Sequence, residues 1–464
     1  MEPLRLTEVL YAVNGQLLKG NPETIITGVT TDSRNVAPGQ LFFAFPGARV
    51  DGHSFVADAL QSGAAGAVIS KPILINTRHP LILVPDPYQA LQNLAKYYRT
   101  LFQVPVIAVT GSTGKTTTKD LIAGVLATRL SVLKTEGNQN NEIGLPLTIL
   151  RITRQHGAVV LEMAMRGRGE IGELCRISRP DVGVITNIGK THLETLGTEA
   201  AIAEAKGELL AALPLEGCAV LNGQDPWQVS LARQFQGNLL FYGEDQRFPV
   251  YALHVKLRGL KGISFLLRTP RGESSCFLPL PGRHNVFNAL AAAAVGHWFG
   301  LMPEEIAQGL ASASVTGMRI EVKDGSGGSK IIDDTYNASP ASVIAGLQLL
   351  ASVPRKGRAV AVLGDMYELG WYTVQGHREV GRAAGELKVD YLFVVGDYAG
   401  EIAQGAREAG MDQERIKVFS DKTAALAFLS EFLEPGDLVL VKGSRAMRME
   451  EIVAGICDQV ISHG

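Results

Sequence analysis

The stretch PVIAVT at 105–110 runs directly into the glycine-rich sequence GSTGKTT, and this passage constrains the fold more than any other. Its uninterrupted apolar residues predict a buried β-strand. The stretch at 119–130 predicts an amphipathic helix with Leu121 and Val125 on its apolar face. A strand, a glycine-rich turn and a helix in this order make a phosphate-binding loop, in which backbone N–H groups surround phosphate oxygens. The sequence therefore predicts an α/β domain that binds nucleotide phosphates.

The side chains of this turn have the chemistry that a triphosphate requires. Lys115 supplies a positive charge to the terminal phosphates, and the hydroxyl of Thr116 is placed to bind Mg²⁺. Val109 occupies the position of the first glycine in the common motif. A glycine-rich turn without a ligand is the alternative, but Gly-Lys-Thr between a strand and a helix favours a phosphate site. The predicted triphosphate site consists of Gly111, Ser112, Thr113, Gly114, Lys115, Thr116 and Thr117.

Composition excludes several other classes of protein. The formal net charge of −2 argues against nucleic acid as the main partner. No apolar run approaches the ~20 residues of a membrane-spanning helix, and the first residues lack a signal-type apolar stretch. The four cysteines are far apart, which fits a reducing compartment and indicates neither disulfides nor a zinc site. We therefore expect a cytoplasmic protein without a membrane span.

The length of 464 residues suggests about three domains, and the local pattern divides the chain accordingly. Residues 1–102 carry short apolar strands around a helix and predict a small α/β domain. Residues 103–317 alternate strands with helices, which predicts a parallel sheet covered on both faces, extended by an antiparallel hairpin within 236–280. Residues 318–464 alternate strands and helices again, which predicts a Rossmann-like, doubly wound sheet.

Polar clusters follow successive predicted strands of this last domain. The carboxyl ends of parallel strands meet at one edge of an open α/β sheet, which is where ligands bind. One such cluster is usually a turn, but four on one edge favour a binding site. Arginine and lysine side chains near this edge are suited to anionic groups. The residues concerned are Arg319, Asp333, Asp334, Asn337, Asp365, Glu368, Asp397, Lys442, Ser444 and Arg445.

Three further polar residues stand where apolar ones are expected. Glu162 lies within a predicted buried strand, where a carboxylate is costly unless it is paired or binds a cation. His192 follows another strand, at the edge where α/β sheets bind ligands. Lys206 follows Ile202 by four residues and precedes Leu210 by four, so it lies on the apolar face of its helix.

Each of these residues also has a plainer explanation. Glu162 would be half of a core ion pair, His192 an ordinary loop histidine, and Lys206 a lysine whose amine reaches water along the helix surface. The functional interpretation of Lys206 is a partly desolvated amine near the nucleotide, because desolvation lowers the pKa of a lysine.

Together with further blocks, these features resemble the Mur ligase family over nearly the whole chain. The phosphate loop without its first glycine is the form found in that family. The blocks GNQNNEIG, YNASP and MYELG resemble the members that add a dipeptide rather than the siblings that add one amino acid. The matching blocks lie at 31–39, 110–117, 136–146, 161–171, 186–197, 204–209, 281–292, 317–322, 333–342, 364–370 and 442–450.

The resemblance implies the three-domain Mur ligase architecture. The N-terminal domain would bind the UDP end of the substrate, the central domain ATP, and the C-terminal domain would close over both, with the glycine-rich stretch 324–329 as the hinge. The implied activity is ATP-dependent ligation of D-alanyl-D-alanine to UDP-N-acetylmuramoyl-tripeptide through an acyl phosphate. The product would be the pentapeptide precursor of peptidoglycan, needed for the cell wall, and the enzyme is expected to act as a monomer.

The resemblance also implies roles for individual residues. Thr116 and Glu162 would bind one Mg²⁺, and His192 with Lys206 a second, with Lys206 carbamylated by CO₂. Lys115, Glu162, His192 and Lys206 would be catalytic. Asn285 and Asn288 would contact adenine, Arg319 the phosphates and Asp334 the ribose. The substrate-binding residues would be Ser33, Arg34, Asp51, His53, Asn138, Asn141, Asn337, Asp365, Glu368, Lys442, Ser444 and Arg445.

Two alternatives share the phosphate loop. Another ligase of the family would add a different amino acid or act on a folate-like substrate, but it should lack the GNQNNEIG and YNASP blocks. A nucleotide-dependent switch without ligase activity would not need a second polar edge in a separate domain.

Overall fold

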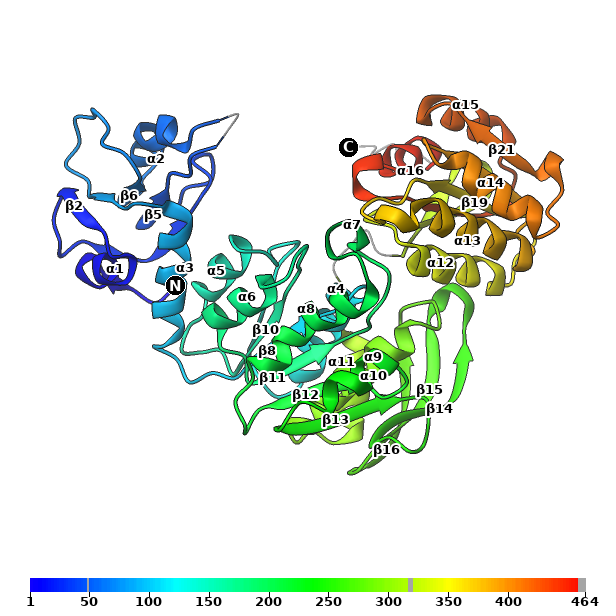
Figure 1. Cartoon of the computed structure of the whole chain (residues 1–464), viewed down its shortest axis with the longest axis horizontal. Coiled ribbons are helices and arrows are strands. Elements are labelled where there is room, and N and C mark those ends of the chain that lie inside the picture. The colour runs from blue at the N-terminus through cyan, green and yellow to red at the C-terminus, as the bar shows by residue number, and fades with distance from the viewer. Residues whose placement is uncertain (48–49, 316–319, 458–464) are drawn as a thin grey trace.

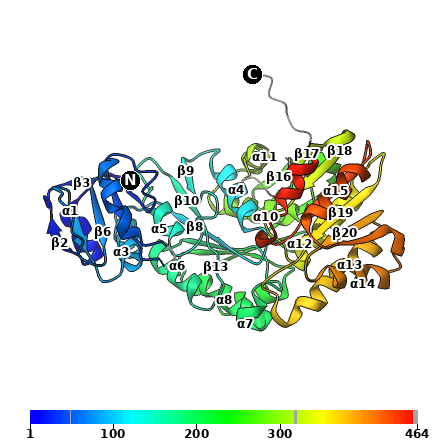
Figure 2. The same cartoon turned by 90° about the horizontal axis from the view of Figure 1, so that it is seen from above.

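The computed structural model describes residues 1–47, 50–315 and 320–457. Three α/β units follow one another in an elongated molecule, with the N-terminal unit at one end and the C-terminal unit at the other (Figure 1). Figure 2 shows the same order from above. Within the described part of the chain, no helix is long and apolar enough to cross a membrane.

The first unit has a five-stranded sheet with helices packed on it. Its strands β4, β5, β6 and β7 pair in parallel, and β2 pairs antiparallel at one edge. In spatial order the strands are β2 (Gln16–Lys19), β7 (Leu81–Leu83), β6 (Gly66–Ile69), β5 (Gln40–Phe43) and β4 (Gly28–Thr30). The other elements are β1 (Leu4–Arg5), β3 (Ile25–Ile26), α1 (Leu6–Val13), α2 (Val56–Gln61) and α3 (Pro87–Arg99). Helix α3 also packs against the second unit, where Tyr98 donates a hydrogen bond to the carbonyl of Ile152 at 2.6 Å.

The second unit is built on a nine-stranded sheet. Its strands are, in spatial order, β16 (Gly272–Leu278), β15 (Ile263–Thr269), β14 (Val250–Leu257), β13 (Asn238–Gly243), β12 (Cys218–Asn222), β11 (Val182–Ile185), β8 (Val106–Thr110), β10 (Ala158–Glu162) and β9 (Val132–Lys134). Pairing is parallel from β9 to β14 and antiparallel for β14, β15 and β16, which confirms the antiparallel hairpin expected within 236–280.

Helices cover both faces of this sheet, as the alternating pattern predicted. Apolar residues of α4 (Lys115–Leu126), α10 (Asn285–Trp298) and α11 (Pro303–Ser312) form one core. Residues of α5 (Gly144–Ile149), α6 (Glu170–Ser178) and α8 (Glu199–Ala211) form the other. Two shorter helices complete the unit, α7 (Leu193–Leu196) and α9 (Pro226–Ala232).

The third unit is doubly wound. Its sheet has the order β17 (Glu321–Gly325), β18 (Ser329–Asp333), β22 (Leu438–Lys442), β19 (Ala359–Gly364), β20 (Tyr391–Val395) and β21 (Ile416–Phe419), and only β17 is antiparallel. One face is covered by α12 (Pro340–Ser352), α13 (Thr373–Glu386) and α14 (Ala399–Glu408). The other face is covered by α15 (Lys422–Phe432) and α16 (Glu450–Ile456).

The glycine-rich stretch 324–329 is not a hinge between units. Gly325 pairs with Ser329 across an antiparallel turn, so the stretch closes the hairpin of β17 and β18 inside the third sheet. Glycines favour sharp turns as much as flexible links, and Gly327 adopts a positive φ of 69° here. The hinge prediction was therefore wrong.

A hairpin of the second unit also reaches the third unit. The turn between β14 and β15, at Gly259–Lys261, extends toward α12 (Figure 1). Leu260 packs against the apolar core of the third unit, although it belongs to the second. The two units therefore share a packing contact away from the chain segment that joins them.

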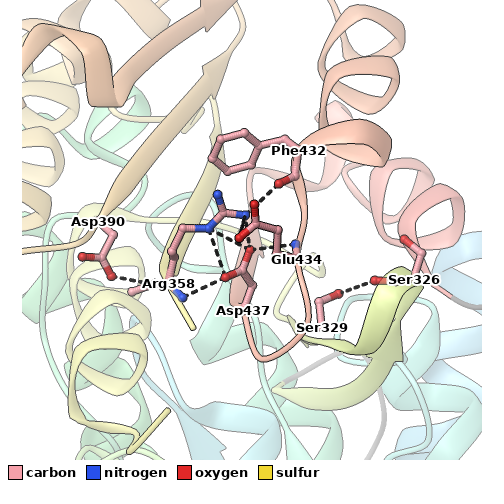
Figure 3. A network of polar contacts seen from close by, with 8 residues as sticks. Ser326, Ser329, Arg358, Asp390, Phe432, Glu434 and Asp437 are labelled. Carbon is pink, nitrogen blue, oxygen red and sulfur yellow. Dashed lines mark hydrogen bonds and ion pairs between the residues drawn. The ribbon is translucent and has the colours of Figure 1, made fainter. Parts of the chain in front are cut away.

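An ion pair with a buried carboxylate fixes the start of two adjacent strands in the third unit (Figure 3). Arg358 precedes β19, and its guanidinium donates to both carboxylate oxygens of Asp437, which precedes β22. The same guanidinium donates to the carbonyl of Phe432 at 2.7 Å and lies 4.2 Å from the centre of its ring. Asp437 is buried, with 1% of its surface exposed. Burial raises the pKa of Asp437, but hydrogen bonds from Arg358 outweigh that effect and lower it.

Replacing Arg358 with methionine is expected to destabilise the protein by about 3 kcal/mol, because a buried carboxylate loses its partner. A carboxylate whose pKa is lower in the folded state stabilises the fold at neutral pH and loses that contribution as the pH falls. The difference between variant and wild type should therefore shrink in acid. Urea unfolding at pH 7 and at pH 3, which is below the ordinary carboxyl pKa of 3.8, measures both effects. Arg382→Met is the control, since its partner Glu408 lies on the surface; equal effects of the two variants would contradict the prediction.

Candidate functional site

A cleft of about 1100 Å³ lies between the second and third units. Its walls come from the phosphate loop, from segments that follow β9, β10 and β11, and from the polar edge of the third sheet. Residues predicted separately in two units therefore face one space. Lys115, Glu162 and His192 line it on one side, and Asp334 and Lys442 on the other.

The glycine-rich turn has the backbone that a phosphate loop needs. Gly111 has a φ of 149° and Gly114 a φ of 76°, both in the region that favours glycine. A Cβ on Gly111 would lie 1.9 Å from Oγ1 of Thr186, and a Cβ on Gly114 would lie 2.6 Å from Oδ1 of Asn288. Glycine is therefore required at both positions for space as well as for conformation.

A residue that the sequence analysis missed holds this turn in place. Asn187 accepts a hydrogen bond from the backbone N–H of Thr113 at 3.0 Å and donates one to the carbonyl of Thr113 at 3.0 Å. Ser112 donates to the carbonyl of Gly189 at 3.1 Å. The available signal was a polar Asn two residues after the strand β11, at the edge where β8 also ends.

Glu162 and Thr116 lie together at the end of β10 and the start of α4. Thr116 Oγ1 donates to Glu162 Oε2 at 2.7 Å, and Asn140 Nδ2 donates to Oε1 at 2.8 Å. Asn138 and Asn141 of this segment were predicted to bind substrate, whereas Asn140 was not predicted. Asn138 and Asn141 line the cleft, and Asn141 also accepts from the N–H of Gly144 at the start of α5.

These oxygen atoms suit Mg²⁺ only together with a nucleotide. Mg²⁺ prefers oxygen ligands and is usually bound by one or two carboxylates, water and substrate phosphates. Among the residues described, there is no group of three or more His, Cys, Asp or Glu side chains that could hold a metal alone. One carboxylate and one hydroxyl beside a phosphate loop match a site in which protein oxygens and nucleotide phosphates bind the ion together.

Lys206 is buried in α8, with 1% of its surface exposed. Burial, and secondarily the charge of Lys115, lower the pKa of Lys206 well below its usual range. The prediction that this lysine lies on an apolar helix face is confirmed, since Ile202, Leu209 and Leu210 on the same helix are also buried. Lys206 is not among the described residues that line the cleft, although it is close enough to Lys115 for that charge to lower its pKa.

His192 and Glu368 meet across the cleft. His192 Nδ1 lies 2.7 Å from Glu368 Oε2, so a residue of the second unit is paired with one of the third. The hydrogen bond from His192 lowers the pKa of Glu368. Spacing along the sequence gave no sign of this pair, because the two residues are far apart in the chain and lie in different units.

Two buried asparagines extend the site along α10. Asn285 Nδ2 donates to the carbonyl of Pro281 at 2.7 Å, and Asn288 Nδ2 donates to Asn285 Oδ1 at 2.9 Å. Thr118 of α4 donates to Asn288 Oδ1 at 3.1 Å. Both asparagines line the cleft next to the phosphate loop.

The polar edge of the third sheet contributes most of its predicted residues to the cleft. Lys442 Nζ lies 2.6 Å from Asp334 Oδ2 and donates to the carbonyl of Asn337 at 2.9 Å. Ser444 accepts from the N–H of Tyr367 at 2.9 Å. Asp334, Asn337, Glu368, Lys442, Ser444 and Arg445 line the cleft. Arg319 lies outside the described residues.

Asp365 differs from its neighbours. It is buried, does not line the described cleft, and accepts hydrogen bonds from the N–H groups of Asp397 and Tyr398 at 2.8 and 3.0 Å. Burial raises the pKa of Asp365. In this structure its contacts hold the start of α14 rather than face the cleft, in contrast to the expectation of a substrate contact.

Comparison with known proteins identifies the family. The Mur ligase middle domain matches residues 109–296, the Mur ligase glutamate ligase domain 318–445, and the Mur ligase family catalytic domain 25–99. A UDP-N-acetylmuramoyl-tripeptide–D-alanyl-D-alanine ligase of Bacillus subtilis is 40% identical over 454 residues, covering 96% of this chain and 98% of its own. The chain belongs to the Mur ligase family.

Other Mur ligases match the chain over nearly its whole length. The Escherichia coli ligase of the same name is 35% identical and covers 98% of this chain and 99% of its own. A crystal structure of MurF from Acinetobacter baumannii has a TM-score of 0.89 at 33% identity, with 98% of each chain covered. MurF from Thermotoga maritima, solved in complex with ADP, has a TM-score of 0.79 at 31% identity, with 92% of this chain and 96% of that chain covered. The predicted three-domain Mur ligase fold is confirmed.

In this Mur ligase the predicted UDP-binding residues lie at the carboxyl edge of the first sheet, away from the lining of the cleft. Asp51 Oδ1 lies 2.6 Å from His53 Nδ1, and Asp51 Oδ2 accepts from Lys71 at 2.7 Å. Ser33 and Arg34 follow β4 at the same edge. Lys71, which follows β6, was missed because a single lysine in a loop is usually solvated.

Proposed function

We propose that this Mur ligase joins D-alanyl-D-alanine to UDP-N-acetylmuramoyl-tripeptide at the expense of ATP. The observation that carries the proposal is the full-length similarity, at 35–40% identity, to ligases named for this reaction. The structure supports it, because one cleft contains both the phosphate loop and the polar edge of the third domain.

The reaction has two chemical steps. A carboxylate oxygen of the tripeptide attacks the γ-phosphorus of ATP, so that an acyl phosphate forms and ADP leaves. The amine of D-alanyl-D-alanine then attacks the acyl carbon, an amide bond forms, and inorganic phosphate leaves with loss of a proton from nitrogen. The first step brings two anions together, and positive charge at the phosphates lowers its barrier.

The second domain provides this charge. The N–H groups of the loop at 111–117 and the ammonium of Lys115 would hold the β- and γ-phosphates. Thr116 and Glu162 would hold Mg²⁺ with Asn140 orienting the carboxylate, and the bound ion supplies further positive charge to the phosphate oxygens. Asn285 and Asn288 are the proposed adenine contacts at the other end of the nucleotide.

We further propose that Lys206 carries a carbamate. Only a neutral amine attacks CO₂, and the lowered pKa of Lys206 makes that form available. The amine nitrogen bonds to the carbon of CO₂ and loses a proton, so a buried neutral amine becomes an anion beside Lys115. Its oxygens, together with His192, are the proposed ligands of a second Mg²⁺.

The remaining assignments concern the residues that would contact the ribose, the phosphates and the two substrates. Asp334 is proposed to contact ribose, Arg319 the phosphates, and Asn138, Asn141, Asn337, Lys442, Ser444 and Arg445 the tripeptide and dipeptide. Ser33, Arg34, Asp51 and His53 are proposed to bind the uridine diphosphate. We place the domain boundaries at 1–102, 103–317 and 318–464. The monomeric state and the cytoplasmic location stay predictions.

Mass spectrometry tests the reaction. The purified chain, ATP and Mg²⁺ are mixed with UDP-N-acetylmuramoyl-tripeptide and either D-alanyl-D-alanine or single amino acids. We expect the pentapeptide product only with the dipeptide. A product with a single amino acid would point to a different ligase of the family, and ATP hydrolysis independent of both substrates would favour a nucleotide switch.

A further inference from the structure

Besides the contact made by Leu260, the second and third domains touch through two short segments beside the cleft. Segment 190–197 follows β11 in the second domain, and segment 368–372 precedes α13 in the third. Trp371 Nε1 donates to the carbonyl of Gly197 at 2.9 Å, and Lys190 Nζ lies 4.1 Å from the centre of the Tyr372 ring. The His192–Glu368 ion pair belongs to this contact and lines the cleft.

The backbone of both partners is unusual. His192 has a φ of 57° and Glu368 a φ of 62°. Residues other than glycine rarely adopt these left-handed angles, and they do so where surrounding contacts hold them. Both strained residues point their side chains at each other across a domain boundary, which indicates a specific pairing rather than a chance surface contact.

The hydrogen bond to Glu368 determines which ring nitrogen of His192 stays available to a partner in the cleft. An ionised carboxylate only accepts hydrogen bonds, so Nδ1 of His192 must carry the proton that lies between them. Nε2 is then the ring nitrogen left for another partner. A histidine held in this way by a carboxylate is oriented, with one fixed nitrogen available to a ligand or a cation.

We propose that Glu368 is a positioning residue that the third domain supplies to the ATP site of the second, by fixing the ring and the tautomer of His192. This deepens the proposed function and rests on it. The site for the triphosphate end of ATP is then complete only when segment 368–372 is docked on segment 190–197. A purely structural role, in which the pair only helps to hold the domains together, is the competing explanation.

Nitrogen NMR of the ligand-free protein tests the proposal directly. In wild type we expect the signal of His192 to show a proton on Nδ1, because a carboxylate only accepts this hydrogen bond. In Glu368→Gln the amide can donate to Nδ1 as well as accept from it, so we expect the contact without a fixed tautomer. In Glu368→Ala we expect the mixture of tautomers of a solvated ring. An unchanged His192 signal in Glu368→Ala would overturn the proposal, whatever the activity.

Kinetics separate positioning from domain docking. Loss of a residue that orients a histidine ligand typically costs about 10–100-fold in activity, so kcat of Glu368→Ala should fall by that factor. Glu368→Gln should lose activity too, because its amide does not fix the tautomer of His192. Trp371→Ala is the matched control, since it removes a docking contact without touching His192. Equal losses in Trp371→Ala and Glu368→Ala would show a structural role and overturn the proposal. Failure of the wild type to form the pentapeptide would instead reject the proposed function, and the NMR result would stand apart from it.

Discussion

Replacing Lys115 with alanine is expected to lower the rate of pentapeptide formation by about 10²- to 10³-fold, the usual cost of losing one charged group that stabilises a transition state. Lys115 is the first residue of α4, and its ammonium donates a hydrogen bond to the carbonyl of Gly111 in the phosphate loop at 2.9 Å. Without that ammonium, less positive charge offsets the repulsion between the attacking carboxylate and the γ-phosphate. The rate of product formation, measured by mass at saturating ATP, tests the expectation.

Two controls sharpen this prediction. Lys96→Ala removes an exposed lysine of α3 that does not line the described cleft, so it should leave the rate unchanged. Thermal unfolding of Lys115→Ala should resemble that of the wild type, because the side chain is only partly buried. A variant that folds normally and turns over at a near wild-type rate would show that the glycine-rich turn is not the phosphate site.

Lys206→Met should separate stability from activity. Methionine is apolar and similar in length, so it fills the same space without the cost of burying a polar amine, and we expect the variant to be at least as stable as the wild type. Ligase activity should nevertheless fall by at least about 10²-fold, if the carbamate supplies metal-binding oxygens. Thermal unfolding and product formation on the same sample measure the two effects.

The pH dependence of stability and the chemical rescue of activity test whether the buried amine and its carbamate cause these two effects. A lysine whose pKa is lower in the folded state binds fewer protons there than in the unfolded chain, so the wild type gains stability as the pH rises through that interval, and Lys206→Met should lack this gain. Lys206→Ala leaves room for a small anion, and formate or acetate should restore part of its activity. Full activity of either variant without added carboxylate would rule out the carbamate, and absence of rescue would leave Lys206 a structural role.

Local pattern was enough to predict the parts of the site that depend on neighbours in the chain. The phosphate loop is defined by a strand, a turn and a helix, and the burial of Lys206 follows from apolar residues one helical turn away. The sheets of the second and third domains were predictable for the same reason, since buried parallel strands are continuous apolar runs.

Long-range pairing was not predictable in this way. Asn140 and Asn187 look like ordinary loop residues until the fold brings them to Glu162 and Thr113. Asp365 sits in a polar cluster after a strand like its neighbours, yet its carboxylate turns back to bind the N–H groups of the next loop. The stretch 324–329 was mistaken for a hinge because glycine marks sharp turns and flexible links alike, and only the register of β17 on β18 separates them.

The hairpin that carries Leu260 has a consequence for how the molecule loses its structure. Because this residue of the second domain is part of the apolar core of the third, melting either domain removes contacts from the other. Apolar burial across the domain boundary couples the unfolding equilibria of the two domains, as any shared interaction does. The second and third domains should therefore denature together as one cooperative block on heating, and the first domain should join that block, because its apolar core is continuous with one core of the second domain.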